Sequence, residues 1–148
     1  MTTHRRLLRT TFFLLIITAV FTNARAAVVD TALTYSAAMK KNIKAVVIKP
    51  DGYNKDQTYP VLYLLHGYGG NYADWISKVP AIKNLADQYK FIIVCPDGNF
   101  GSWYFDSPVD PAWKYETYVA TELVTYIDKN YSTIKNRSGR AITGLSMG

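Results

Sequence analysis

The last five residues, Gly144-Leu145-Ser146-Met147-Gly148, form a G-x-S-x-G pattern. This pattern is typical of a nucleophilic serine held at a sharp turn between a strand and a helix. Such a turn leaves no room for side chains beside the serine, so we expect both flanking glycines to be required. The Ser146 hydroxyl would then attack a carbonyl carbon and form a covalent intermediate. The alternative is a simple turn in which Ser146 only caps a helix.

Acyl transfer also needs two N–H donors directed at the oxygen that becomes negatively charged. One would be the backbone N–H of Met147, directly after the serine. The segment HGYGG, residues 66–70, follows an earlier apolar run and could supply the other. Its glycines, Gly67, Gly69 and Gly70, would let the backbone approach a substrate, and Tyr68 is the best candidate for the second N–H donor.

His66 is a possible general base, but its position favours another role. It immediately precedes the candidate oxyanion loop, where an imidazole can brace the loop through hydrogen bonds. In proteins that use this serine turn, the order along the chain is serine, then acid, then histidine. The only other histidine, His4, lies near the N-terminus. We therefore interpret His66 as support for the loop.

The segment PDGNFGSWYFDSP, residues 96–108, is polar, rich in glycine and aromatic. Trp103 and Tyr104 could line a pocket for an acyl group or an aromatic ring. Packing of these aromatic residues on their own domain is an equal alternative. Asp97 and Glu116 precede the serine, so we expect them to hold loops through hydrogen bonds rather than to act as the catalytic acid.

Apolar segments alternate with helical patterns along the rest of the chain. Strands buried on both faces and joined by helices predict an α/β fold, with a mostly parallel sheet covered on both sides. Ligands bind such sheets outside the carboxyl ends of the strands, where the three loops described above begin. Strands are expected at 42–50, 61–67, 91–98 and 140–143, and helices at 80–89 and 115–131.

The first 26 residues have the pattern of a secretory signal peptide. Three arginines precede the apolar run TFFLLIITAVF, and the small-residue sequence Ala24-Arg25-Ala26 follows it. We expect cleavage after Ala26 and a secreted or periplasmic protein. Four of the 17 basic residues and none of the 11 acids lie in this segment, which leaves 13 bases against 11 acids, a net charge of +2. This small charge does not favour nucleic-acid binding.

The single cysteine, Cys95, lies within the apolar run FIIVCP. One cysteine excludes a disulfide within the monomer, so an exported domain would depend on its apolar core. We interpret Cys95 as a small buried apolar residue rather than a reactive thiol.

Four segments in order resemble the esterase D-like branch of the α/β-hydrolases: YPVLYLLHGYGGNYADW, FIIVCPDGNFGSWYFDS, YETYVATELVTYID and RAITGLSMG. The resemblance covers residues 43–148. This branch includes feruloyl and acetylxylan esterases, tributyrin-type esterases, S-formylglutathione hydrolases and the antigen 85 mycolyltransferases. It implies Ser146 as the nucleophile, Tyr68 and Met147 as oxyanion donors, and chemistry without a metal or other cofactor. Leu145 and the export signal both disfavour an S-formylglutathione hydrolase.

The resemblance also places the catalytic acid and histidine after the serine. The sequence ends at Gly148, so we interpret residues 27–148 as the N-terminal part of an esterase domain, truncated at the nucleophile turn and inactive alone. We expect such a piece to be poorly stable, with 61–65 and 91–94 deprived of covering neighbours.

The leading hypothesis is an exported serine esterase that acts on acylated polysaccharides or small acyl esters, with no membrane association after signal cleavage. Two alternatives stay open. The first is an acyltransferase of the mycolyltransferase type, and the second is a non-catalytic module that binds carbohydrate through Trp103 and Tyr104.

Overall fold

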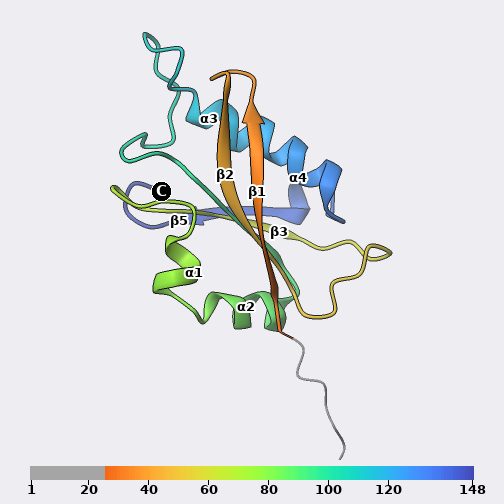
Figure 1. Cartoon of the computed structure of the whole chain (residues 1–148). Helices are drawn as coiled ribbons and strands as arrows, with labels where there is room; N and C mark the ends of the chain where they lie inside the picture. The colour runs from red at the N-terminus through yellow and green to blue at the C-terminus, as the bar shows by residue number, and fades with distance from the viewer. Residues whose placement is uncertain (1–25) are drawn as a thin grey trace, which may run out of the picture.

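The computed structural model describes residues 26–148, so the expected signal peptide lies outside the described residues except for Ala26. The described chain forms one five-stranded sheet in the order β1-β2-β4-β3-β5 (Figure 1). The strands are β1 (Val28–Ser36), β2 (Lys41–Lys49), β3 (Val61–Leu65), β4 (Ile92–Pro96) and β5 (Arg140–Gly144).

Three of these strands run parallel. β3 lies between β4 and β5 and pairs in parallel with both, while β2 pairs antiparallel with β4 and with β1. The expected α/β class is confirmed, in a mixed sheet whose parallel part holds the strands that lead into the candidate loops. Because parallel strands end at the same edge of a sheet, the segments after β3, β4 and β5 emerge together.

β1 is an additional strand, outside the strands expected from the sequence. It forms an antiparallel hairpin with β2, in which Ser36 pairs with Lys41. Its inward positions include the buried polar side chains of Thr34 and Ser36. The hydroxyl of Thr34 donates to the carbonyl oxygen of Ile43 and lies 2.6 Å from the hydroxyl of Tyr118. Polar residues on the buried face obscure the alternation that would otherwise indicate a strand.

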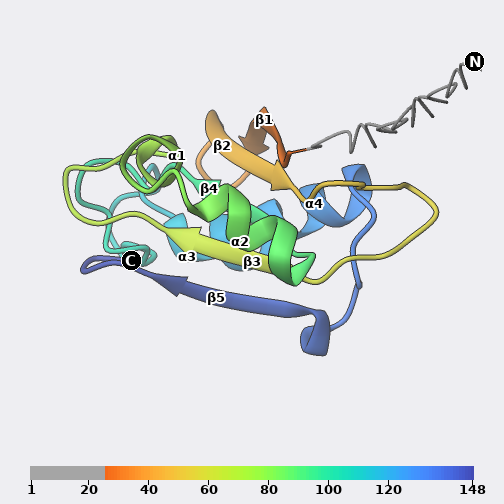
Figure 2. The same cartoon turned by 90° about the horizontal axis from the view of Figure 1, so that it is seen from below.

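Helices cover both faces of the sheet (Figures 1 and 2). α1 (Asp74–Lys78) and α2 (Ile82–Tyr89) lie over one face, where Ile82 and Ala86 pack against β2, β3 and β4. The segments α3 (Tyr115–Thr117), η1 (Tyr118–Leu123) and α4 (Val124–Asn130) lie over the other. No helix within residues 26–148 is long and apolar enough to cross a membrane.

The expected helix at 115–131 is confirmed over 115–130, with a π-helical turn at η1 in its middle. Its inward face carries Tyr115, Tyr118, Val119, Leu123 and Ile127, all buried. One extra residue in a turn widens the helix and changes the direction of its side chains. Here the widened turn lies beside the hairpin of β1 and β2.

The expectation that β3 and β4 would lack covering neighbours is wrong. Val61, Tyr63 and Ile92 are buried, because β4 lies between β2 and β3 and because β5 pairs with the outer edge of β3. The exposed strand is instead β5, which forms the edge of the sheet (Figure 2). Ile142 at its centre is 60% exposed.

Cys95 is buried in β4, as expected. Burial raises the pKa of its thiol to about 12. The thiol is therefore protonated at neutral pH, and a protonated thiol is a poor nucleophile.

Candidate active site

Ser146 lies at a tight turn directly after β5. Its backbone has a φ of 56°, a left-handed conformation that is rare for a residue with a side chain. The N–H of Leu145 donates to the carbonyl oxygen of Leu65, and the N–H of Gly148 donates back to the carbonyl oxygen of Leu145. Strain of this kind persists where the surroundings enforce it, and it is concentrated at functional sites.

The expected need for glycines in this turn is confirmed. A Cβ atom on Gly144 would lie 2.7 Å from the carbonyl carbon of Gly148 and 2.9 Å from two atoms of Leu65. A Cβ atom on Gly148 would lie 2.6 Å from the Cβ of Leu65. Both glycines therefore let the turn fold back onto the end of β3.

The register of the sheet brings the serine turn and the loop after β3 together. Leu65, the last residue of β3, pairs with Gly144, the last residue of β5. A Cβ atom on Gly67 would lie 3.6 Å from the Cβ of Ser146 and 3.3 Å from the carbonyl oxygen of Leu145. A glycine at position 67 thus allows the two backbones to approach each other.

The two candidate oxyanion donors have no partner within the described part of the chain. Within residues 26–148, no hydrogen bond uses the backbone N–H of Tyr68 or of Met147. The side chain of Met147 is buried and anchors the turn, whereas that of Tyr68 is 61% exposed. The role of these N–H groups as oxyanion donors stays a prediction.

The other glycines shape the loop itself. Gly69 has a φ of 73°, and its N–H donates to the carbonyl oxygen of Phe100 at 2.7 Å. The N–H of Gly70 donates to the carbonyl oxygen of Gly67 at 3.1 Å. A Cβ atom on Gly70 would lie 2.6 Å from a carboxylate oxygen of Asp74, so the loop closes tightly against α1.

His66 is buried, with 2% of its surface exposed, and both of its ring nitrogens are hydrogen-bonded. Its Nε2 accepts from the backbone N–H of Gly98 at 2.8 Å. Since that nitrogen is the acceptor, Nδ1 carries the proton and donates to the carbonyl oxygen of Gly67, also at 2.8 Å. His66 therefore joins the loop after β3 to the loop after β4, and neither nitrogen is free to take a proton from Ser146.

Replacement of His66 by phenylalanine is expected to lower the free energy of unfolding by about 1–3 kcal/mol, because the buried N–H of Gly98 loses its acceptor. Chemical denaturation measures this change. Asn71→Ala is the control, since it removes only an exposed loop hydrogen bond. An unchanged free energy of unfolding in His66→Phe would contradict a supporting role.

The two candidate substrate-binding aromatics lie in different environments. Trp103 is 60% exposed, with a φ of 53°. Tyr104 packs against the core, and its hydroxyl accepts from the backbone N–H of His66 at 3.1 Å. Burial raises the pKa of this hydroxyl, so it stays protonated. Tyr104 thus has the packing that the alternative interpretation expects, while a binding role for Trp103 stays a prediction.

Of the two carboxylates expected to hold loops, only Asp97 does so through its side chain, which accepts from the N–H of Asn99 at 2.8 Å. Glu116 is exposed, and its carboxylate accepts no hydrogen bond within the described part of the chain. Asp106, which was not among the expected loop-holding carboxylates, accepts hydrogen bonds from the N–H and the hydroxyl of Thr117. Burial acts to raise the pKa of Asp106. The hydrogen bonds from Thr117, the charge of Lys114 and the backbone N–H of Glu116 together lower this pKa below its usual value.

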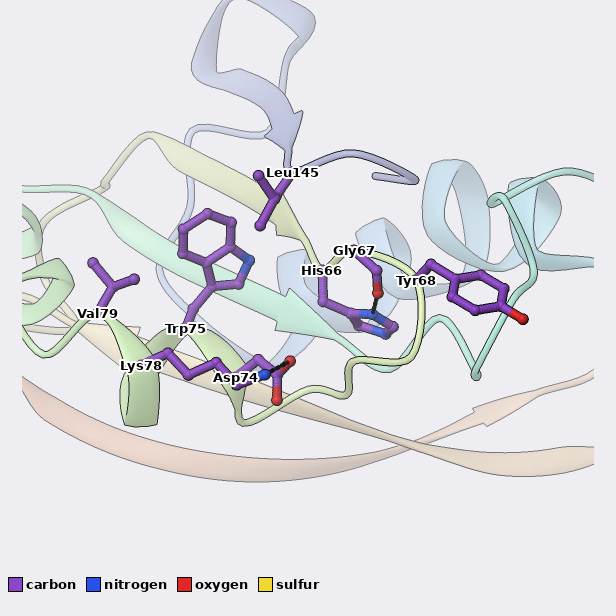
Figure 3. Close-up of a pocket in the computed structure, with 8 residues that line it drawn as sticks. All are labelled: His66, Gly67, Tyr68, Asp74, Trp75, Lys78, Val79 and Leu145. Atoms are coloured by element: carbon purple, nitrogen blue, oxygen red, sulfur yellow. Dashed lines mark hydrogen bonds and ion pairs between the residues drawn. The ribbon is translucent and has the colours of Figure 1, made fainter.

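The structure also shows a cavity of about 150 Å³ beside the serine turn (Figure 3). Its walls come from the loop at 66–68, from Leu145, and from Trp75 and Val79 in and directly after α1. No pattern in the sequence predicts this cavity. Trp75 follows the glycine loop closely in sequence, but only the fold of α1 shows that its ring lies beside Leu145.

This combination of a doubly covered α/β sheet and a serine turn beside a glycine loop defines the class of α/β-hydrolases. The family model described as "Putative esterase" matches residues 36–148, and the chain belongs to this family. The family assignment confirms the resemblance that the four sequence segments carry.

Three relatives indicate the range of activities in this family. The chain is 32% identical over 122 residues to an acetyl esterase of Caldicellulosiruptor saccharolyticus (77% of this chain, 45% of the relative). It is 36% identical over 126 residues to an endo-1,4-beta-xylanase/feruloyl esterase of Xylanibacter ruminicola, a match that covers 77% of this chain and 17% of the relative. The structure of a ferulic acid esterase matches with a TM-score of 0.73 at 35% identity, and the match covers 84% of this chain and 52% of the esterase. The chain thus spans about half of the length of these relatives, or less.

Proposed function

We propose that the full-length protein is an exported serine esterase that hydrolyses acylated polysaccharides or small acyl esters through an acyl-enzyme on Ser146. The observation that carries this proposal is the strained, exposed Ser146 beside two unused backbone N–H groups. A capping serine would need neither the left-handed backbone nor the adjoining glycine loop.

In the proposed reaction, the Ser146 oxygen attacks the ester carbonyl carbon while a general base takes the serine proton. The carbonyl oxygen becomes an oxyanion and accepts hydrogen bonds from the N–H groups of Tyr68 and Met147. The bond to the alcohol then breaks, the alcohol takes the proton, and the acyl group remains on Ser146. Water, activated by the same base, releases the acid and restores the serine.

The general base is part of this proposal. His66 is the only histidine in residues 26–148, and its two ring nitrogens are engaged with Gly98 and Gly67. We therefore assign the base and its orienting acid to residues of the full-length protein outside this chain.

Two observations support an acylated carbohydrate as the substrate. The relatives include an acetyl esterase and a xylanase with feruloyl esterase activity in its name. Exposed aromatic side chains also surround the loops of the site: Tyr68 and Phe100 pack edge to face with ring centres 4.7 Å apart, and Trp103 lies near them in sequence. Aromatic faces suit contacts with sugars and with aryl groups. The basic and apolar N-terminal segment supports export.

Rapid mixing of the full-length protein with p-nitrophenyl acetate tests the proposal. An acyl-enzyme predicts a burst of nitrophenol close to one equivalent of protein, followed by slower steady release. Mass spectrometry of the quenched reaction should locate the acetyl group on the peptide that contains Ser146. Acetylation at another residue, or steady release with no covalent adduct, would refute the mechanism. Added sugar acceptors distinguish transfer from hydrolysis, because only transfer yields acetylated sugar.

A further inference from the structure

The loop after β4 and the loop after β3 interlock beside the serine turn. The backbone N–H of Gly69 donates to the carbonyl oxygen of Phe100 at 2.7 Å. The ring of Tyr68 lies against Gly101, where a Cβ atom would come within 2.9 Å of the ring. The loop after β4 is therefore one support of the loop that carries the candidate oxyanion donor Tyr68.

The orientation of the Tyr68 N–H is set by the carbonyl group of the same peptide unit. That carbonyl oxygen, on Gly67, accepts from the N–H of Gly70 at 3.1 Å and from the Nδ1–H of His66 at 2.8 Å (Figure 3). No peptide bond among residues 26–148 is cis, so the C=O and the N–H of this unit point in opposite directions. Because the carbonyl is held toward His66, the N–H of Tyr68 points away from it. The position of the imidazole thus decides where this N–H lies.

Tyr104 fixes both ends of this histidine. Its hydroxyl accepts from the backbone N–H of His66 at 3.1 Å, and its ring lies edge to face with the imidazole, with ring centres 5.7 Å apart. The Tyr104 ring also covers Gly98, where a Cβ atom would lie 2.3 Å from it. The N–H of Gly98 in turn donates to Nε2 of His66 at 2.8 Å. Tyr104 therefore holds the backbone of His66 directly and its ring through Gly98.

The backbone that presents Tyr104 is strained. Trp103 and Tyr104 have φ values of 53° and 50°, so two consecutive residues with side chains are left-handed. The N–H of Tyr104 donates to the hydroxyl oxygen of Ser102, which is buried. Such strain persists where the surroundings enforce it, and it is concentrated at functional sites. In this turn the Tyr104 ring packs inward, while Trp103 stays exposed.

We propose that Tyr104 is a positioning residue of the esterase. Its hydroxyl holds His66, His66 holds the carbonyl group of Gly67, and this arrangement directs the Tyr68 N–H at the oxyanion. The inference rests on the proposed function of Ser146, and it assigns to Tyr104 an effect on catalysis that passes through His66. This effect belongs to the transition state, where the oxyanion forms, and not to the binding of the ester.

Tyr104→Phe tests the inference because it removes the hydroxyl and keeps the ring. In the full-length protein, the burst with p-nitrophenyl acetate gives the rate constant of acylation and the dissociation constant of the ester. Acylation should slow on the order of ten-fold, since loss of a whole oxyanion donor costs about 100- to 1,000-fold. The dissociation constant should stay within about two-fold, because the ester itself carries no oxyanion.

Phenyl trifluoromethyl ketone provides a second measurement. The Ser146 oxygen bonds to its carbonyl carbon, the C=O electron pair moves onto the carbonyl oxygen, and the general base takes the serine proton. The adduct therefore carries an oxyanion like that of the transition state, and its affinity should fall in Tyr104→Phe by about the same factor as acylation.

Tyr53→Phe is the matched control. The hydroxyl of Tyr53 also accepts from a backbone N–H, that of Ser132 at 2.8 Å. Tyr53 precedes the start of β3, however, whereas the serine turn follows the end of β5, at the opposite edge of the sheet. Both variants should lose stability, but only Tyr104→Phe should slow acylation. In a His66→Phe background, Tyr104→Phe should cause no further loss, because its effect passes through the imidazole.

An unchanged acylation rate in Tyr104→Phe would overturn the inference. Equal losses in Tyr104→Phe and Tyr53→Phe would also overturn it, because they would reflect general weakening of the fold. A loss confined to the binding of the ester would place Tyr104 in contact with the substrate and reject the positioning role. Losses that add fully in the His66→Phe background would rule out an effect through His66.

Failure of the proposed function is a separate result, in which the unmodified protein hydrolyses no ester. The NMR signal of the Tyr68 backbone N–H then tests the inference without catalysis, in full-length protein labelled at its tyrosine nitrogens. Its loss in Tyr68→Phe assigns the signal. Tyr104→Phe should shift this signal and Tyr53→Phe should leave it in place. An unshifted signal in Tyr104→Phe would show that the hydroxyl does not position the Tyr68 N–H.

Discussion

Replacement of Ser146 by alanine is expected to lower kcat/KM of the full-length protein for p-nitrophenyl acetate by about four orders of magnitude or more. Removal of the nucleophile from a serine hydrolase has an effect of this size, because the residual rate comes only from binding and from the oxyanion donors. The acetyl adduct should disappear together with the burst. Steady-state kinetics and mass spectrometry measure the two effects.

The loss should not come from unfolding. Alanine at position 146 retains a Cβ atom and therefore the same backbone strain at φ 56°, so the midpoint of thermal unfolding should change little. Ser138→Ala serves as the matched control, because Ser138 is exposed and its hydroxyl binds only Asn136. Full activity in Ser146→Ala would eliminate Ser146 as the nucleophile.

Replacement of Gly144 by alanine is expected to reduce both stability and activity. The new Cβ atom would lie 2.7 Å from the carbonyl carbon of Gly148 and 2.9 Å from both the carbonyl oxygen and the Cβ of Leu65. Most of these neighbours are backbone atoms that cannot rotate away, so the turn must shift. Overpacking of this kind costs about 1–3 kcal/mol, measured as the free energy of unfolding. A displacement of Ser146 by about 1 Å should lower kcat about 100-fold.

Gly52→Ala separates this steric effect from ordinary backbone strain. Gly52 has a φ of 71°, and a Cβ atom there would contact nothing within 4 Å. The substitution should cost about 1–2 kcal/mol through its left-handed backbone alone and leave kcat unchanged, because Gly52 is remote from the serine turn. Equal kcat in the two variants would show that the turn does not depend on close packing at Gly144.

Local patterns in the sequence predicted most of the elements. The apolar runs that form β3 and β4 are buried on both faces, and the spacing from Tyr115 to Ile127 matches the buried face of the long helical segment. Such patterns are visible because burial of a whole strand or of one helix face requires apolar residues at regular positions. β1 could not be predicted from its sequence because the polar residues Thr34 and Ser36 occupy its buried face. The hydroxyl of Thr34 bonds to Ile43 and Tyr118, and that of Ser36 accepts from the N–H of Met39 in the hairpin turn.

The sequence by itself determined the family, the serine turn and the glycine loop, because each depends on residues that are adjacent along the chain. Only the tertiary structure decided that the His66 ring bonds to the loop after β4, that Tyr104 packs inward and that Trp75 lies beside Leu145. These three features depend on the pairing of β3 with β5 and on the path of the loop after β4. Contacts between segments tens of residues apart follow from how the whole sheet is assembled, and no local pattern specifies them.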